Sequence, residues 1–144
     1  MNRACKFCQI MAGERPGFEV FADEVSFAFL DDRPLFPGHV LLVPKTHYQT
    51  LQDLPVELAG PLFANARLLA RAVEEGLGAE GAFVAINNRV SQSVPHLHIH
   101  VVPRRRKDGL KGFFWPRHKY RGEDHMREVQ QILQAAVERL RPGR

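Results

Sequence analysis

Residues 95–104 read PHLHIHVVPR, so three histidines alternate with apolar side chains. Successive side chains of a β-strand point to opposite faces of its sheet. A strand here would bury Leu97, Ile99 and Val101 in a core and line its other face with three imidazoles. Imidazole titrates near neutral pH and can act as a nucleophile, a proton carrier or a metal ligand. The stretch therefore predicts both a buried strand and a chemically active surface.

The sequence on either side predicts the other elements of a mixed fold. Four short apolar runs have the length and composition of strands. These runs lie at residues 20–21, 25–30, 39–43 and 82–86. Residues 54–76 and 122–140 instead repeat apolar side chains at spacings of three and four, which is typical of amphipathic helices. We therefore predict an α+β fold, in which two main helices cover a mostly antiparallel sheet of about five strands.

The first of these helices carries its own boundary signals. Asp53 is expected as the N-cap, with Pro55 in the first turn. Gly76 and Gly78 are typical of the C-terminal stop. Pro61 lies inside the pattern and lacks the N–H that a helix interior uses, so we expect a bend or a broken first turn there.

The bulk properties point to one globular domain. Of the 144 residues 44% are hydrophobic and 25% are charged, a balance that excludes a disordered chain. One domain over 1–144 is long enough to bury a sizeable core. No apolar run approaches the roughly 20 residues of a membrane helix, and residues 1–8 lack the apolar segment of a signal peptide. We expect a cytoplasmic domain without membrane contact.

A basic segment directly follows the histidine stretch. Residues 104–121 hold eight lysines and arginines against one acid, Asp108. Such a segment attracts anions, and its position favours a polyphosphate partner. Phe113, Phe114 and Trp115 lie within it, where they could stack on a base or be buried.

Two chemistries fit three imidazoles on one strand face. They could bind a metal ion, or a central imidazole could attack while its neighbours orient it or bind charge. A three-histidine catalytic metal usually needs a nearby acid to fix the tautomers, yet no Asp or Glu lies between Gly81 and Val102. The residues nearby are neutral hydrogen-bonding groups and one cation: Asn87, Asn88, Arg89, Ser91, Gln92 and Ser93. This composition favours phosphoryl or nucleotidyl transfer.

Cys5 and Cys8 are the only cysteines and are spaced Cys-x-x-Cys. A thioredoxin-type motif needs a preceding strand, and four residues leave no room for one. The pair can be two free thiols or half of a zinc site. His47 and His96 are available as the other two ligands, but spacing alone does not choose among seven histidines.

The chain resembles the histidine triad (HIT) family of nucleotide hydrolases and transferases, whose signature is His-φ-His-φ-His-φ-φ, with φ apolar. Residues 96–102 match this signature in full. Residues 29–45, FLDDRPLFPGHVLLVPK, are similar to the nucleotide-binding half of the family, and Gln92-Ser93-Val94 stands where the family carries Gln-Ser/Thr-Val. The resemblance runs from about Cys5 to Arg104 and implies a HIT-like fold.

The resemblance also implies roles for individual residues. His98 would be the nucleophile that takes the α-phosphate of a nucleotide, His100 would bind the phosphate and assist proton handling, and His39 would lie in the same pocket and orient His98. The substrate-binding residues would be Asp31 for the ribose hydroxyls, Gln92 and Ser93 for phosphate or leaving-group oxygens, and an asparagine that is either Asn87 or Asn88. One departure is the loop 87–91, which lacks the glycine that the family often has there.

A metal and a partner follow from the same resemblance. In zinc-bearing branches of the family a structural zinc is held by positions that match Cys5, Cys8, His47 and His96. Family members are usually homodimers, so we expect a homodimer, a nucleotide substrate and no nucleic-acid partner.

The function expected from the resemblance is hydrolysis of dinucleoside polyphosphates such as diadenosine tetraphosphate, through a covalent nucleotidyl-histidine intermediate. Two other enzymes are open: a phosphorylase that uses phosphate in place of water, and a nucleoside phosphoramidase. A nucleotide- or RNA-end-binding module without turnover is the alternative from outside the enzymes.

Overall fold

The computed structural model of the protein describes residues 2–111 and 117–141. The chain consists of two compact units, Met1–Asp108 and Gly109–Arg144. The single domain over 1–144 stays a prediction.

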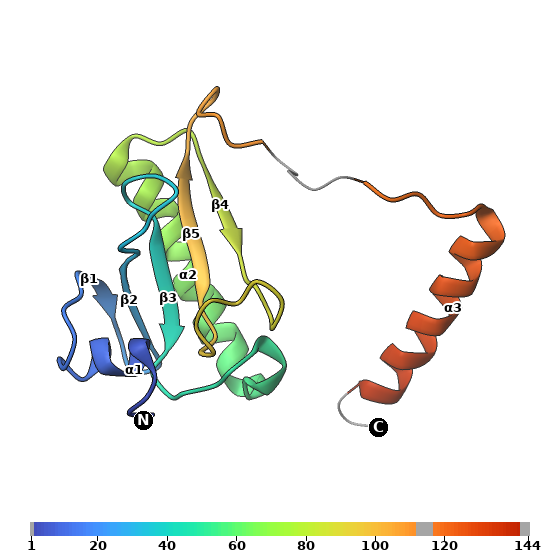
Figure 1. Cartoon of the computed structure of the whole chain (residues 1–144), viewed down its shortest axis with the longest axis horizontal. Coiled ribbons are helices and arrows are strands. Elements are labelled where there is room, and N and C mark those ends of the chain that lie inside the picture. Colours follow the sequence, from blue (N-terminus) through green and yellow to red (C-terminus); the bar gives the residue numbers. More distant parts are fainter. Residues whose placement is uncertain (1, 112–116, 142–144) are drawn as a thin grey trace. The chain divides into compact units, whose positions relative to one another are not determined.

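A five-stranded antiparallel sheet forms the centre of the first unit. Its strands are β1 (Glu19–Ala22), β2 (Ser26–Leu30), β3 (Val40–Pro44), β4 (Gly81–Ala85) and β5 (Ile99–Arg104). They lie in the order β1-β2-β3-β5-β4, and every neighbouring pair is antiparallel (Figure 1). The predicted fold class is therefore confirmed.

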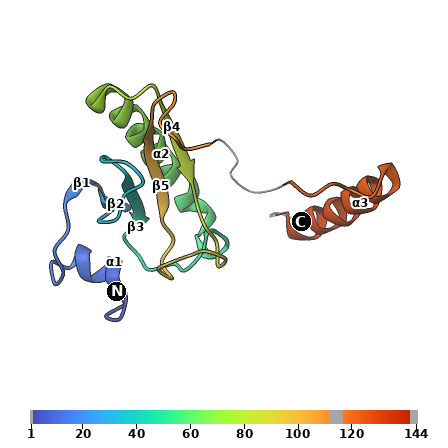
Figure 2. The ribbon, with the colours of Figure 1, turned by 45° about the horizontal axis from the view of Figure 1, so that its top comes forward.

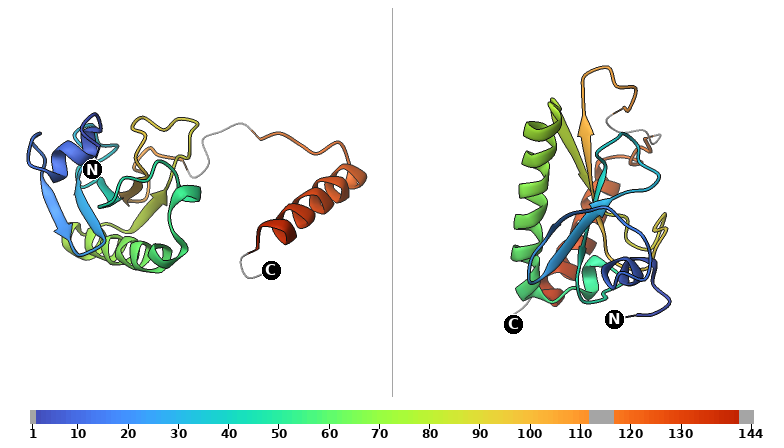
Figure 3. Two further views of the ribbon diagram at one scale, coloured as in Figure 1. Left: turned by 90° about the horizontal axis from the view of Figure 1, so that it is seen from below. Right: turned by 90° about the vertical axis from the view of Figure 1, so that its left-hand side faces the viewer.

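Two helices pack on opposite faces of this sheet. The long helix α2 (Val56–Leu77) covers one face, and the short helix α1 (Lys6–Met11) lies on the other (Figure 3). Figure 2 shows α2 running along β5 and β4, against which it packs. A 3-10 turn, η1 (Leu51–Asp53), precedes α2.

The start of α2 differs from the prediction in two respects. Asp53 does not cap this helix, because its carboxylate accepts hydrogen bonds from the N–H and hydroxyl of Thr50 and so closes the capping box of η1. Pro55 occupies the N-cap position of α2 instead. The expected broken turn at Pro61 is also wrong, since α2 is continuous from Val56 to Leu77. Pro61 is the sixth residue of α2, and its missing N–H leaves the carbonyl four residues earlier without its usual helical donor.

The histidine stretch forms a shorter strand than predicted. β5 begins at Ile99, so only His100 of the three histidines lies inside it. Upstream of β5 the main chain bonds to a loop, because the Leu97 N–H donates to the Tyr48 carbonyl at 2.7 Å. The predicted start at residue 95 is wrong for this reason, but the alternation of the two faces continues through residues 96–98.

Two apolar clusters fill the spaces on either side of the sheet. The cluster beneath α2 contains Leu97, Ile99 and Val101, each fully buried, as the alternation predicts. The helix contributes four buried side chains to it, Leu62, Ala66, Leu69 and Val73. The cluster beneath α1 contains Cys5, Phe7, Cys8, Ile10, Phe27, Phe29, Leu41 and Val43. The imidazoles of the histidine stretch lie on this second face.

The basic residues at the end of β5 and directly after it are engaged in local contacts. Arg104 makes two hydrogen bonds to the Asp108 carboxylate, at 2.7 and 3.1 Å. Arg105 donates to the carbonyls of Leu77 and Gly78 and so caps the C-terminus of α2. Arg106 pairs with Glu80 at 3.3 Å. Three of the predicted phosphate-attracting cations therefore have local partners at this end of the first unit. Phe113, Phe114 and Trp115 lie outside the described residues.

The second unit contains α3 (Glu123–Leu140), within one residue of the predicted helix. Within the second unit none of the residues of α3 is buried, including its apolar side chains Leu133 and Val137. Within residues 2–111 and 117–141, no helix combines the length and apolarity that crossing a membrane requires.

The loop between β4 and β5 contains backbone strain. Arg89 and Ser91 have φ of +68° and +61°, a left-handed conformation that costs side chains other than glycine about 1 kcal/mol or more. These positions lie in the glycine-free stretch 87–91, so the loop has a conformation suited to glycine without the residue itself.

We expect Arg89→Gly to raise the free energy of unfolding by about 0.5–1 kcal/mol, because glycine adopts this φ without steric cost. Urea denaturation of the variant measures the change. Val90 provides a matched control, since it is 81% exposed and has an ordinary negative φ. Val90→Gly should lower stability; a similar loss in Arg89→Gly would show that the strain is absent.

Candidate active site

Three histidines come together where β3 and β5 pair. In the register of these strands Leu41 lies opposite His100 and Val40 opposite Val101. His39 directly precedes β3, so this register brings its Nε2 to 3.0 Å from the Nδ1 of His100. The His98 and His100 rings lie 4.9 Å apart between centroids. The sheet thus gathers side chains that are 61 residues apart in the sequence.

A main-chain N–H fixes the tautomer of His39, and the His39 ring in turn fixes that of His100. The Leu35 N–H donates to the Nδ1 of His39 at 3.1 Å, so this nitrogen carries the lone pair and the proton is on Nε2. That proton is donated to the Nδ1 of His100. The remaining proton of a neutral His100 is therefore on its Nε2. His100 lines a large cavity and offers it a hydrogen-bond donor.

A carbonyl fixes the tautomer of His98 in the same way. The Nδ1 of His98 lies 2.7 Å from the His96 carbonyl oxygen, which can only accept, so Nδ1 carries the proton. The Nε2 of His98 then holds the lone pair. The ring of Phe7 packs edge-on against this imidazole, with centroids 5.0 Å apart and an interplanar angle of 82°. His98 is a neutral, oriented nitrogen base with restricted freedom.

Burial keeps these imidazoles uncharged. It lowers the pKa of His100 to about 4, with further lowering from the nearby His98 and His39. Burial also lowers the pKa of His98 and of His39, although the Asp31 carboxylate opposes both shifts. At pH 7 the His98 lone pair is therefore available for attack.

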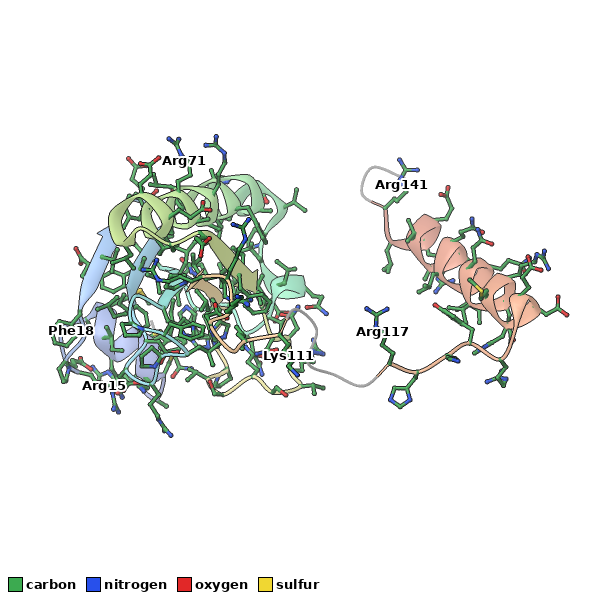
Figure 4. The ribbon with its side chains drawn as sticks, turned by 90° about the horizontal axis from the view of Figure 1, so that it is seen from above. Arg15, Phe18, Arg71, Lys111, Arg117 and Arg141 are labelled. Carbon is green, nitrogen blue, oxygen red and sulfur yellow. The ribbon has the colours of Figure 1, made fainter. Side chains whose placement is uncertain are left out.

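A cavity of about 990 Å³ opens in front of His98 and His100. One part of its wall is apolar, formed by Phe7, Ile10, Phe18, Phe29, Leu30 and Leu41. Its polar part holds Asp31, Ser93 and the two histidines, with Lys6, Arg15 and Arg33 also in the wall. Figure 4 labels Arg15 and Phe18, which lie together at one end of this unit. An apolar section beside a few convergent polar groups is typical of a small-molecule site.

The second cluster of this face combines both cysteines with two histidines. The Sγ atoms lie 3.4 Å (Cys5) and 3.6 Å (Cys8) from the Nδ1 of His96, and Cys8 Sγ lies 3.5 Å from the Nδ1 of His47. A tetrahedral zinc with ordinary bond lengths would separate sulfur and nitrogen ligands by about 3.5–3.6 Å. The Nε2 of His96 donates to the Pro44 carbonyl at 2.9 Å, which leaves Nδ1 unprotonated. These four residues therefore fit a structural zinc ion.

A second potential cluster, formed by Asp31, His39 and His100, suits a metal less well. A neutral His39 that bound a metal through Nε2 would carry its proton on Nδ1. This nitrogen accepts the Leu35 N–H, so two hydrogens would face each other. The cluster is better suited to transmitting hydrogen bonds than to binding a cation.

The other predicted site residues divide into two groups. Asp31 and Ser93 line the cavity, whereas Asn87, Asn88 and Gln92 are not among the described residues of its wall. Asn88 accepts the Leu51 N–H, and Gln92 bridges the Arg89 N–H and the Gln49 carbonyl. His39 lies behind His100 and contacts it directly, whereas the family resemblance implied a role for it in orienting His98.

The apolar wall of the cavity was not predicted from the sequence. Phe29 pairs with Leu41, and Leu41 pairs with His100, so these three residues form a row across one face of the sheet. Alternation within each strand could have assigned them to a common face, but only the strand order and register place them side by side. Phe7 and Ile10 come from α1, a helix that the apolar spacing did not indicate.

Comparison with known proteins gives one family. The family model described as HIT domain matches residues 12–107 of this chain. The chain is 33% identical over 112 residues to adenylylsulfatase HINT3 of Arabidopsis thaliana, an alignment that covers 76% of this chain and spans only 57% of that relative. It is 35% identical over 111 residues to adenosine 5'-monophosphoramidase HNT1 of Saccharomyces cerevisiae, covering 76% and 69% of the two chains.

A solved structure resembles this chain over nearly its whole length. It is the crystal structure of a Zn-bound histidine triad family protein from Mycobacterium smegmatis, with a TM-score of 0.71 and 38% identity. The match covers 92% of this chain and 97% of that one.

Proposed function

Since this chain belongs to the HIT family of nucleotide hydrolases and transferases, we propose that it transfers a nucleotidyl group to His98 and then to water. The observation that carries the proposal is the tautomer of His98. Its Nδ1–H is held by the His96 carbonyl, and its Nε2 lone pair is available in a cavity large enough for a nucleotide.

The proposed reaction has two displacements. The Nε2 lone pair of His98 bonds to the α-phosphorus while the bond from phosphorus to the leaving group breaks, and the leaving group departs with that electron pair. The Nδ1–H of His98 stays hydrogen-bonded to the His96 carbonyl oxygen, and this hydrogen bond stabilises the positive charge of the modified ring. Water then attacks the phosphorus, the P–N bond breaks and its electrons return to Nε2. One water is consumed, and its protons end on the departing groups and solvent.

Neighbouring groups stabilise the charge that develops on phosphorus. The Nε2–H of His100 is a donor for a phosphate oxygen, and the Ser93 hydroxyl lies in the same wall. Because the pKa of His100 is about 4, few molecules hold it as an imidazolium at pH 7. It therefore acts as a hydrogen-bond donor rather than as a full proton source. Asp31, whose carboxylate is oriented by the Arg33 N–H at 2.9 Å, would accept the ribose hydroxyls.

Two classes of substrate fit this site. Dinucleoside polyphosphates such as diadenosine tetraphosphate have a leaving group that needs no proton at neutral pH. Nucleoside phosphoramidates are the second candidate, favoured by the relative named adenosine 5'-monophosphoramidase. Arg104, Arg105 and Arg106 were expected to attract a long polyphosphate. Their local partners weaken this reason for preferring the dinucleoside polyphosphate. The experiment must also distinguish the proposed hydrolase from a phosphorylase and from a binding module without turnover.

The product profile tests this proposal. Diadenosine tetraphosphate, adenosine 5'-phosphoramidate and adenylyl sulfate would each be incubated with the protein, with and without inorganic phosphate, and separated by chromatography. Release of AMP from at least one substrate supports the hydrolase. The substrate that yields AMP identifies the leaving group that the site accepts. Phosphate-dependent formation of ADP would indicate a phosphorylase. Nucleotide binding without any product would overturn the enzymatic proposal.

We expect turnover to fall as the pH drops, with a midpoint below the ordinary imidazole pKa of 6.5. Protonation of His98 removes its lone pair, and burial lowers its pKa below the ordinary 6.5, so the loss begins below the usual imidazole range. Initial rates on diadenosine tetraphosphate measure this, because its α-phosphates do not titrate in that range. Circular dichroism at each pH checks the fold. A midpoint above pH 7 would contradict a buried, neutral nucleophile.

Zinc is the structural metal that we propose for Cys5, Cys8, His47 and His96, and the related structure from Mycobacterium smegmatis is described as Zn-bound. It would supply no chemistry to the reaction and would hold the N-terminus against the sheet. The homodimer stays a prediction. The cytoplasmic location also stays a prediction from the sequence.

A further inference from the structure

The helix α1 connects the cysteine-histidine cluster to the cavity. It has six residues, and a helix this short is not stable alone in water. Cys5 is its N-cap and, together with Cys8, faces the cluster. Phe7 and Ile10 of the same helix are in the wall of the cavity. Whatever holds the two cysteines therefore also holds one wall of the proposed nucleotide site.

Phe7 forms the closest connection between the two sites. It is 3% exposed, and its ring contacts His98 at 5.0 Å, Phe29 at 5.3 Å and His96 at 6.0 Å between centroids. Moving α1 would withdraw this ring from the nucleophile and from the apolar wall of the cavity together.

His96 provides a second connection through the main chain. Its Nδ1 faces both cysteines, and its own carbonyl oxygen accepts the Nδ1–H of His98. One residue thus offers a side-chain ligand to the metal cluster and a main-chain acceptor to the nucleophile. A shift of His96 would therefore change both the position of its own ring and the orientation of the His98 ring.

We propose that metal occupancy of this cluster sets the nucleotide affinity of the cavity, with Phe7 as the positioning residue that couples them. The inference rests on the proposed function only in requiring that the cavity binds a nucleotide. Coupling between two binding sites is reciprocal: zinc must raise the affinity for AMP by the same factor by which AMP raises the affinity for zinc. A factor of about ten lies within the usual range of such couplings.

The test measures both sides of this equality on the full chain. Isothermal titration calorimetry gives the AMP affinity of zinc-loaded and chelator-treated protein, and competition with a chromogenic chelator gives the zinc affinity with and without saturating AMP. We expect both ratios to be about tenfold and equal. Ratios below about twofold on both sides overturn the coupling, while AMP binding that persists leaves the nucleotide site intact. No AMP binding in any form overturns the coupling and the proposed function together.

A pair of matched variants identifies the coupling residue. Phe7→Leu and Phe27→Leu remove the same aromatic volume from the same apolar cluster, but Phe27 is not among the described residues of the cavity wall. We expect Phe7→Leu to reduce the coupling factor to about two, and Phe27→Leu to leave it near about ten. Equal factors in the two variants would overturn the role of Phe7. Circular dichroism of the metal-free protein must show the native helix content, because a chain that unfolds without zinc would couple the two ligands through folding itself, which would overturn the role of Phe7.

Discussion

Replacing His98 with alanine should lower kcat by about 10⁴-fold or more while the variant still binds AMP. Alanine has no lone pair to form the nucleotidyl intermediate, so only direct attack by water remains. The apolar wall of the cavity and Asp31 are unchanged by this substitution, which is why binding persists. Steady-state kinetics on whichever substrate yields AMP, together with calorimetry of AMP binding, measure the two effects separately.

Two further observations make this result specific to a covalent route. Acid quenching of the wild-type protein during turnover should give a species heavier by one nucleotidyl group in mass spectrometry, and His98→Ala should not. His125→Ala is the matched control, because His125 lies in α3 and its Nδ1 accepts the Arg121 N–H. It should keep wild-type kinetics. An His98→Ala enzyme with more than about a tenth of the wild-type activity would contradict nucleophilic catalysis by this residue.

His100→Ala should lower kcat by about 10²–10³-fold with a smaller effect on KM. The substitution removes one fixed donor from the charge that develops on phosphorus, and losing such a donor costs about 3–4 kcal/mol of transition-state stabilisation. The donor exists because the Leu35 N–H and the His39 ring together place the single ring proton of neutral His100 on Nε2. The ratio of the kcat values of variant and wild type measures the effect.

The matched variant is His100→Gln, whose amide N–H can lie about where the imidazole Nε2–H lies. It should recover at least about tenfold of the activity that His100→Ala loses. Equal rates for the two variants would show that His100 supplies something other than a hydrogen bond. Circular dichroism of both variants separates this effect from any change in folding.

The sequence predicted the parts of this protein in which one pattern repeats. Alternation over residues 97–101 indicated which side chains enter the core, and the helical spacing of Leu62, Ala66, Leu69 and Val73 indicated the buried face of α2. These patterns follow from the period of a single element, so no tertiary information is needed. The family resemblance likewise identified the four residues that the structure brings into one metal-sized cluster.

Features that depend on how elements meet were not predictable in this way. The Leu97 N–H bonds to Tyr48 and not to a neighbouring strand, so β5 starts later than its composition indicates. Asp53 has the chemistry of an N-cap for α2, but a competing capping box with Thr50 takes its carboxylate. The arginines after β5 have the charge of an anion site, yet the carbonyls at the end of α2 and two nearby acids engage them. In each case a partner outside the pattern itself decides the outcome.

The protonation pattern of the four histidines has a consequence for how such a site can change through evolution. Peptide groups set it for three of the four: the N–H of Leu35 for His39 and the carbonyls of His96 and Pro44 for His98 and His96, while the His39 ring sets it for His100. A peptide group survives most substitutions of the side chain attached to it. Mutations can therefore accumulate across the cavity wall, altering which molecules enter, while descendants inherit the same attacking nitrogen. The reaction depends largely on main-chain groups, whereas substrate selectivity depends on the side chains of the cavity wall. Substrate selectivity can therefore change during evolution while the reaction stays the same.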